Sequence, residues 1–351
     1  MVSLTHTGIS TNNNKARERR TSLAIRMNIM ALSTEIIITL QQLKGVGKQT
    51  ILSIARSTSA SSMNELWENW ETLKAPRLKK ITRDDLMYAN QKALQIINTS
   101  EELGIGIISY FDDAFPQLLK DCVNEKGKVD PSLVLYYRGD LKVLSLPGVA
   151  VIGTREPTST GVNAGKYFSG KLAERGFNIV SGLAVGCDTS GHEGALDAGG
   201  VTTAFLATSL AWDDIYPQEN LELAKKIVEN GGLLLSEYAI GQHAGRYNFV
   251  ERDRLQAGLS YATVVVQTGI HGGTMHAVNA TLQAHKPLYV VKFKRDEDLD
   301  NPKTQGNSKL LKGGKAMPLC SSNVDKTILR IKEVAASYQP LQKELLLFAT
   351  V

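Results

Sequence analysis

Between residues 148 and 291, short apolar runs alternate with stretches of helical character. Each run is continuously apolar, which is typical of strands buried on both faces. The connections between the runs are long enough to hold helices, which favours parallel strands covered on both sides. We therefore predict an α/β fold with a Rossmann-like, doubly wound, mostly parallel sheet. The expected strands are 149–152, 178–180, 202–207, 233–235, 262–267 and 288–291.

Loops rich in small residues follow three of the expected strands. Ligands of a doubly wound sheet bind beyond the carboxyl ends of its strands, where these loops would meet. Each loop precedes an expected helix, whose first N–H groups and positive dipole end favour an anion. The sequence therefore predicts a phosphate-binding edge. Its candidate residues are Gly153, Thr154, Arg155, Ser181, Gly182, Gly186, Gly272, Gly273 and Thr274.

These loops lack the motifs of common nucleotide-dependent enzymes. The segment Gly153-Thr154-Arg155 is not the GxGxxG fingerprint of dinucleotide-binding folds, and no Walker A motif occurs. We therefore expect no cofactor and no catalytic residue. His271 and His276 have no cysteine or acidic residue nearby at ligand spacing, so we also expect no bound metal.

The segment 31–103 has a different, helical pattern. Apolar residues recur at helical spacing between 32 and 43, and a Gly-Val-Gly turn then precedes a second apolar helix. This order is typical of a helix-hairpin-helix, whose glycines let backbone N–H groups approach a phosphate. A plain corner between two helices of a small bundle explains the same pattern. We expect a small helical domain of the helix-hairpin-helix or SAM-like kind, with Gly45, Gly47 and Lys48 as candidate DNA contacts.

The remaining segments flank these two domains. Residues 104–147 contain two further expected strands and form an extension that leads into the sheet domain at 148–293. In the C-terminal segment 294–351, the polar, Gly- and Lys-rich stretch 294–315 is expected to be a long loop. A last helix is expected at 327–336.

The net charge of +5 is concentrated at the N-terminus. Residues 1–30 hold five basic side chains and one acidic side chain, a balance of +4, so the rest of the chain carries about +1. We expect this stretch to be a disordered basic tail. A DNA site in the folded part must therefore come from local clustering of charge.

Cysteine usage and hydropathy suggest the compartment. Cys122, Cys187 and Cys320 form no CxxC pair, which suits a reducing cytoplasm. No apolar run is long enough to span a membrane, so we expect no membrane association.

A series of short motifs runs through the expected sheet domain. They lie at 149–155, 181–188, 216–220, 236–238 and 249–254, and read VAVIGTR, SGLAVGCD, YPQEN, SEY and FVERDR. In order and spacing, this series resembles the DNA-processing protein A (DprA/Smf) family. The upstream segment 107–139 resembles the linker that precedes the same family's Rossmann-like domain.

The resemblance implies a cytoplasmic, homodimeric, non-enzymatic protein. It implies binding of single-stranded DNA, assistance in loading the RecA recombinase, and protection of incoming DNA during natural transformation. Arg155 and Arg246 would hold backbone phosphates, and Phe249 would stack on a base, a combination that suits single-strand binding. Arg252 and Arg254 lie further along the same segment and would extend the positive surface. Pairing with acidic groups inside the domain is the alternative role for both.

Two departures from the family pattern leave other functions open. Asp253 stands where the family has an asparagine between two arginines, and Gly272-Gly273-Thr274 replaces its usual loop. One alternative is a sensor of a nucleotide ligand, of the kind used in defence. Another is a nucleotide phosphoribohydrolase with His271 and His276 as acid–base groups. A closed pocket would favour a small ligand, and an open groove would favour a strand.

Overall fold

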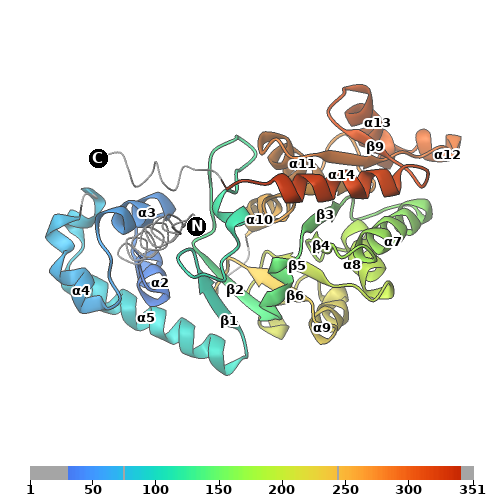
Figure 1. Cartoon of the computed structure of the whole chain (residues 1–351). Helices are drawn as coiled ribbons and strands as arrows, with labels where there is room; N and C mark the ends of the chain where they lie inside the picture. Colours follow the sequence, from blue (N-terminus) through green and yellow to red (C-terminus); the bar gives the residue numbers. More distant parts are fainter. Residues whose placement is uncertain (1–30, 74–75, 243–244, 341–351) are drawn as a thin grey trace, which may run out of the picture. The chain divides into compact units, whose positions relative to one another are not determined.

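The computed structural model describes residues 31–73, 76–242 and 245–340, which form two compact units (Figure 1). One unit comprises the described residues up to Gln95, and the other comprises those from Ile96 onward. The expected basic tail at 1–30 lies outside the described residues.

The first unit is helical. Its helices are α2 (Thr34–Gln42), α3 (Lys48–Ser57), α4 (Met63–Glu68) and the first part of α5 (Arg83–Glu102), with 3-10 turns at Trp70–Thr72 and Pro76–Lys80. Local side-chain bonds define where two of them begin. The Ser33 hydroxyl accepts a bond from the N–H of Ile36 at the start of α2. Before α5, Thr82 and Asp85 each accept a bond from the other's backbone N–H, which satisfies two donors at the helix start.

The turn between α2 and α3 contains both glycines of the expected helix-hairpin-helix. Gly45 has a φ of +82°, which favours glycine, and Gly47 is extended at the start of α3. A Cβ added to either glycine would meet open space. Lys48 is the first residue of α3. The backbone therefore has the expected turn, and the proposed DNA contact by Gly45, Gly47 and Lys48 stays a prediction.

A nine-stranded sheet organises the second unit, with its helices packed around it (Figure 1). The strand order is β1-β2-β6-β5-β4-β3-β7-β8-β9, and the strands from β3 to β9 pair in parallel. The predicted mostly parallel, Rossmann-like sheet is confirmed. The strands are β1 (Gly106–Ser109), β2 (Val134–Gly139), β3 (Gly148–Ile152), β4 (Asn178–Ser181), β5 (Thr202–Leu206), β6 (Leu233–Ser236), β7 (Ala262–Val265), β8 (Leu288–Val291) and β9 (Met317–Leu319).

Helices cover both faces of this sheet. Val149 and Val151 of β3 belong to a core that also contains buried residues of α7 (Ser159–Ala173) and α14 (Val324–Ser337). Ala150 and Ile152 belong to a second core with α11 (Thr274–Gln283) and α13 (Gln305–Lys312). Continuous apolar strands follow from this two-sided burial. The other helices of the unit are α6 (Gln117–Lys120), α8 (Cys187–Asp197), α9 (Leu221–Glu229), α10 (Arg246–Gly258) and α12 (Asp296–Leu299).

The prediction of a long loop at 294–315 is wrong. This stretch contains α12, a 3-10 turn and α13, and it leads into β9, which pairs in parallel with β8. The polar residue Asn307 explains why composition was misleading. It is buried, and its side-chain amide donates to the carbonyls of Val266 and Val291 and accepts from the N–H of Thr268. A polar side chain here therefore ties strand ends together instead of marking a loop.

The extension and the last helix also differ in detail from expectation. The strands of 104–147 are part of the same sheet, because β2 pairs antiparallel with β6 and β1 pairs antiparallel with β2. The last helix, α14, begins at Val324, earlier than the predicted start at 327.

Candidate functional site

A cavity of about 510 Å³ lies at the carboxyl ends of the central strands. β3 sits between β4 and β7, so the chain extends the sheet first to one side of β3 and then to the other. Ligands of doubly wound sheets bind at such a switch point. The cavity is lined by residues 153–156 after β3, by one side of α10, and by the loop and helix start that follow β7.

Arg155 is the exposed cation of the first loop. The backbone before it is closely packed, because the N–H of Thr154 donates to the carbonyl of Gln267 at 2.7 Å. A Cβ on Gly153 would lie 2.7 Å from that same carbonyl oxygen, so only glycine allows this approach. Gly153 and Thr154 therefore position Arg155 at the cavity edge, and both line the cavity themselves.

Phe249 and Tyr216 form an aromatic ridge beside Arg155. The Arg155 guanidinium carbon lies 5.6 Å from the centre of the Phe249 ring, a cation–π contact. Tyr216 meets Phe249 edge to face with ring centres 5.6 Å apart, and it is half exposed. A second hollow of about 750 Å³ is also lined by Arg155, Phe249 and Tyr216. The two hollows thus border on one ridge. Together they form a longer surface for a ligand than a single pocket would.

Sequence reasoning did not select Tyr216 as a site residue. It is part of the motif at 216–220, so its position was visible, but its role was not. Contact with Phe249 joins residues 33 positions apart, and only the fold brings them together.

The loop after β7 is open, as expected of an anion site. His271, Gly272 and Gly273 are exposed, and a Cβ on either glycine would meet open space. Gly273 stands at the start of α11 and has no side chain to cap it, while Thr274 is the first helical residue. The positive end of α11 therefore faces the cavity edge, where a phosphate would be favoured.

Ser181, at the end of β4, and Gly182, in the loop after it, are already bonded within the protein, which corrects the prediction that these two residues bind phosphate. Ser181 is fully buried, and its hydroxyl donates to the carbonyl of Val151 at 2.6 Å. The N–H groups of Gly182 and Ala184 both donate to a carboxylate oxygen of Asp188. These N–H groups thus bind the carboxylate of Asp188 instead of an external anion.

Gly186 supports the first loop, and its predicted contact with a phosphate stays a prediction. Its φ is +89°, and an added Cβ would lie 2.6 Å from the carbonyl carbon of Arg155. The Thr154 carbonyl accepts a bond from the N–H of Cys187 at 3.1 Å. The second loop therefore presses against the first and holds the segment that carries Arg155.

Gly186→Ala is expected to lower the free energy of unfolding by about 1–3 kcal/mol, because it adds both backbone strain and a clash. Chemical denaturation measures this loss. Gly176→Ala is the matched control, since Gly176 has a φ of +84° but open space at its Cβ. Equal losses in the two variants would show that contact with the first loop contributes nothing.

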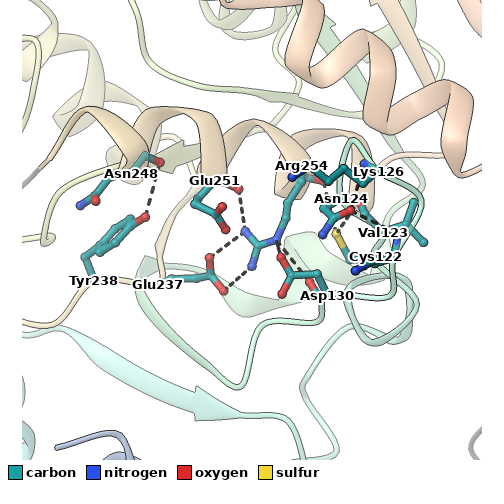
Figure 2. A network of polar contacts seen from close by, with 11 residues as sticks. Cys122, Val123, Asn124, Lys126, Asp130, Glu237, Tyr238, Asn248, Glu251 and Arg254 are labelled. Atoms are coloured by element: carbon teal, nitrogen blue, oxygen red, sulfur yellow. Dashed lines mark hydrogen bonds and ion pairs between the residues drawn. The ribbon is translucent and has the colours of Figure 1, made fainter. Parts of the chain in front are cut away.

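Arg254 does not extend a positive surface, which corrects that prediction (Figure 2). It is only 3% exposed, and it makes two 2.8 Å bonds to the carboxylate of Glu237 and a 2.9 Å ion pair with Asp130. It also donates to the carbonyl of Glu251. Burial lowers the pKa of the guanidinium, but the facing Glu237 outweighs this and raises it above its usual value. Arg254 is a structural cation.

Arg252 is also buried, at 5% exposure, so it too does not extend the surface. It donates to the carbonyl of Phe205 at 3.1 Å, and its Nε lies 3.3 Å from Asp253. A Cβ on Gly182 would lie 1.5 Å from Arg252 Nη1, so this side chain fills the space that glycine leaves. Arg252 nevertheless lines the cavity floor.

Two carboxylates line the same cavity: Asp188 is buried, and the side chain of Asp253 is 15% exposed. Burial raises the pKa of Asp188, although Arg252 and the backbone donors of its loop oppose this. Burial raises the pKa of Asp253 to about 6; Arg252 opposes the shift, and Asp188 adds to it.

His276 and His271 are the other titratable groups at this edge. His276 Nδ1 lies 2.7 Å from a carboxylate oxygen of Glu125, and both side chains are partly exposed. His271 is exposed on the open loop. Neither belongs to a cluster that suits a metal ion, since the described ranges contain no group of three or more histidine, cysteine, aspartate or glutamate side chains so placed.

Arg246 is the first residue of α10, and its side chain lies outside the described part of the structure. Its predicted role as a phosphate ligand therefore stays a prediction. Across the described ranges, no helix is both long and apolar enough to cross a membrane.

Residues 106–330 match the family described as DNA recombination-mediator protein A. The chain belongs to this family. The matched region contains the whole sheet and the cavity at its edge, so the DprA/Smf resemblance is confirmed. The family's description is that of a mediator and not of an enzyme, which agrees with the expectation of no catalytic role.

Curated DprA and Smf proteins are similar to this chain. DNA processing protein DprA of Bacillus subtilis is 29% identical over 278 residues, which cover 75% of this chain and 89% of that protein. Protein Smf of Synechocystis is 36% identical over 190 residues, which cover 53% of this chain and 46% of that protein. The chain therefore spans about half the length of the Synechocystis relative.

Solved DprA structures share the fold. The structure of DprA from Streptococcus pneumoniae aligns with a TM-score of 0.64 at 24% identity, covering 88% of this chain and 99% of that chain. DNA processing protein A from Helicobacter pylori aligns with a TM-score of 0.54 at 29% identity, covering 67% of this chain and 97% of that chain. The latter structure is described as giving insight into a unique single-stranded DNA binding mode.

Proposed function

We propose that this DprA/Smf family member binds single-stranded DNA along the carboxyl edge of its sheet and acts as a mediator in DNA recombination. The observation that carries the proposal is the Arg155–Phe249–Tyr216 ridge between two hollows. A cation beside exposed aromatic rings suits a flexible strand, because phosphates and bases alternate along it. The single-stranded DNA binding mode described for the Helicobacter pylori relative supports the same assignment.

Phosphates would lie on Arg155 and at the start of α11, with Gly272, Gly273 and Thr274 offering backbone approach. Arg246, at the start of α10, would add a second cation. Bases would stack on Phe249 and Tyr216. The proposal extends to a cytoplasmic homodimer that helps to load RecA and protects incoming DNA in natural transformation, roles that follow from the family resemblance.

The test is titration of a short single-stranded oligonucleotide across salt concentrations. The logarithm of the association constant should fall linearly with the logarithm of salt, by about 0.7 for each neutralised phosphate. Arg155→Ala should weaken binding about tenfold or more, because charge-assisted contacts contribute about 1.5–3 kcal/mol, and should reduce the salt slope by about 0.7.

Arg175→Ala is the matched control for charge. Arg175 follows α7 and precedes the start of β4, so it lies at the opposite edge of the sheet, where it pairs with Asp325. Arg175→Ala should leave both the affinity for the oligonucleotide and the salt slope nearly unchanged. Salt-independent binding, or no binding to any oligonucleotide, would contradict the proposal. A nucleoside monophosphate that binds tightly and displaces no strand would favour the nucleotide-sensor alternative, and release of free base would favour the phosphoribohydrolase.

A further inference from the structure

The floor of the cavity contains hydrogen-bond acceptors that the proposed phosphate contacts do not use. Gln256 is 2% exposed and lines the cavity. Its amide nitrogen donates to Asp253 Oδ1 at 3.2 Å, while its amide oxygen has no hydrogen-bond partner within the described residues. A buried acceptor without a partner costs free energy, so the site is built for a ligand that donates.

The orientation of the Gln256 amide follows from its neighbour. An ionised carboxylate only accepts hydrogen bonds, so the nitrogen of Gln256, and not its oxygen, must face Asp253. The oxygen therefore has no hydrogen-bond partner among the described residues.

Asp253 supplies a second acceptor. Its described contacts, with Gln256 Nε2 and with Arg252 Nε at 3.3 Å, both involve Oδ1. Asp188, in contrast, already accepts bonds from the N–H groups of Gly182 and Ala184. Asp253 and Gln256 thus give the cavity lining two neighbouring acceptors on α10.

The walls of the cavity suit a flat, partly apolar group. Phe249 and Val250 line it from α10, and Ile152 and Ala277 line it from β3 and α11. Its volume of about 510 Å³ falls within the range of ligand pockets, about 300–1,000 Å³. A nucleobase turned out of a strand is read in such pockets by hydrogen bonds to its Watson–Crick edge and by apolar walls.

We propose that this cavity receives one base of the bound strand and that Asp253 and Gln256 select guanine. On its Watson–Crick edge guanine has two adjacent donors, N1–H and the N2 amino group, which would bond to the oxygens of Asp253 and Gln256. Adenine and cytosine present one amino group beside an acceptor nitrogen, and thymine presents a single N–H between two carbonyls. A site that must bond buried polar groups discriminates against a ligand that leaves them unpaired. The inference rests on the proposed single-strand binding.

The test compares oligothymidine strands that differ in a few isolated positions, which hold dG, dA, dC, deoxyinosine or dT. Wild-type protein should bind the dG strand about tenfold more tightly than the dT strand, since a bidentate base contact contributes about 1–3 kcal/mol. Deoxyinosine, which lacks the N2 amino group, should lose a large part of this gain. Both comparisons use the unaltered protein, so they do not depend on how a variant folds.

Asp253→Asn should abolish the preference for dG while the dT strand still binds. Glu251→Gln is the matched control, because Glu251 is an exposed carboxylate on the same helix that does not line the cavity. It removes the same charge and should leave the preference intact. Equal affinity for all strands, a preference that survives deoxyinosine, or an unaltered preference in Asp253→Asn would overturn the inference while leaving strand binding in place. Failure to bind any strand would instead overturn the proposed function.

Discussion

Replacing Arg254 with alanine should lower the free energy of unfolding by about 3–5 kcal/mol, the largest effect that we expect from a single substitution in this chain. The guanidinium is 3% exposed and holds the carboxylates of Glu237 and Asp130, which are themselves largely buried. Removing it takes the guanidinium away from both carboxylates in a region of low dielectric constant. Figure 2 shows how the contacts of Arg254 join α10 to two other segments of the chain.

Urea denaturation measures this loss, and Arg175→Ala again provides the control. Arg175 pairs with Asp325 at a similar distance, 2.9 Å, but both side chains are well exposed. Exposed pairs contribute about 0–1 kcal/mol, so the two variants should differ severalfold. A loss for Arg254→Ala as small as that of the control would refute the structural role. If Arg254 instead held a phosphate, folded Arg254→Ala protein would show a smaller salt slope in strand binding.

Asp253→Asn should stabilise the protein at pH 8 by up to about 3 kcal/mol and have little effect near pH 4. Burial, opposed by Arg252, raises the pKa of Asp253 to about 6 from an ordinary value of 3.8. A difference of about two pH units corresponds to about 3 kcal/mol. The titratable and charged groups that act on this carboxyl are Arg252, Asp188, His276 and Arg155.

Proton binding determines the direction in which Asp253 changes the stability with pH. Between about pH 4 and pH 6 the folded state binds the proton of Asp253 more tightly than the unfolded state, so stability falls as the pH rises. Above pH 6 the full cost of the buried charge is present. Asparagine has no such charge, and the variant should therefore lose the part of the pH dependence that Asp253 causes.

Denaturation curves of both proteins at several pH values test this expectation. Glu251→Gln serves as the control, because an exposed carboxylate has little burial cost to relieve. A stability difference between wild type and Asp253→Asn that does not change with pH would contradict the shifted pKa.

The sheet was predictable because its signal is local. Parallel strands buried on both faces must be apolar at every position, and that pattern is visible without knowing their partners. β9 escaped prediction because it has only three residues, Met317–Leu319, and includes Pro318. It forms because β8 offers a free edge, which is a property of the folded sheet and not of the short segment.

The candidate site was predictable only in part, for a related reason. Loops after strands can be located from the strand pattern, so Arg155 and the Gly272-Gly273 loop were placed correctly at one edge. Whether a backbone N–H remains available depends on neighbours distant in sequence. Asp188 accepts bonds from the N–H groups of Gly182 and Ala184, so these two donors are not available to a phosphate.

The sequence by itself determined the α/β class, the meeting of several loops at one edge of the sheet, the family, and the presence of Arg155 and Phe249 at that edge. Only the tertiary structure decided which cations and acids face a ligand. In the sequence, Arg252 and Arg254 resemble surface cations. In the fold both are buried, and they bond to the carbonyl of Phe205 and to the carboxylate of Glu237, respectively. The charge and type of a residue can be read from the sequence. Its burial and its partners depend on which residues the fold places next to it. Burial and partners decide whether a charged side chain binds a ligand or stabilises the fold.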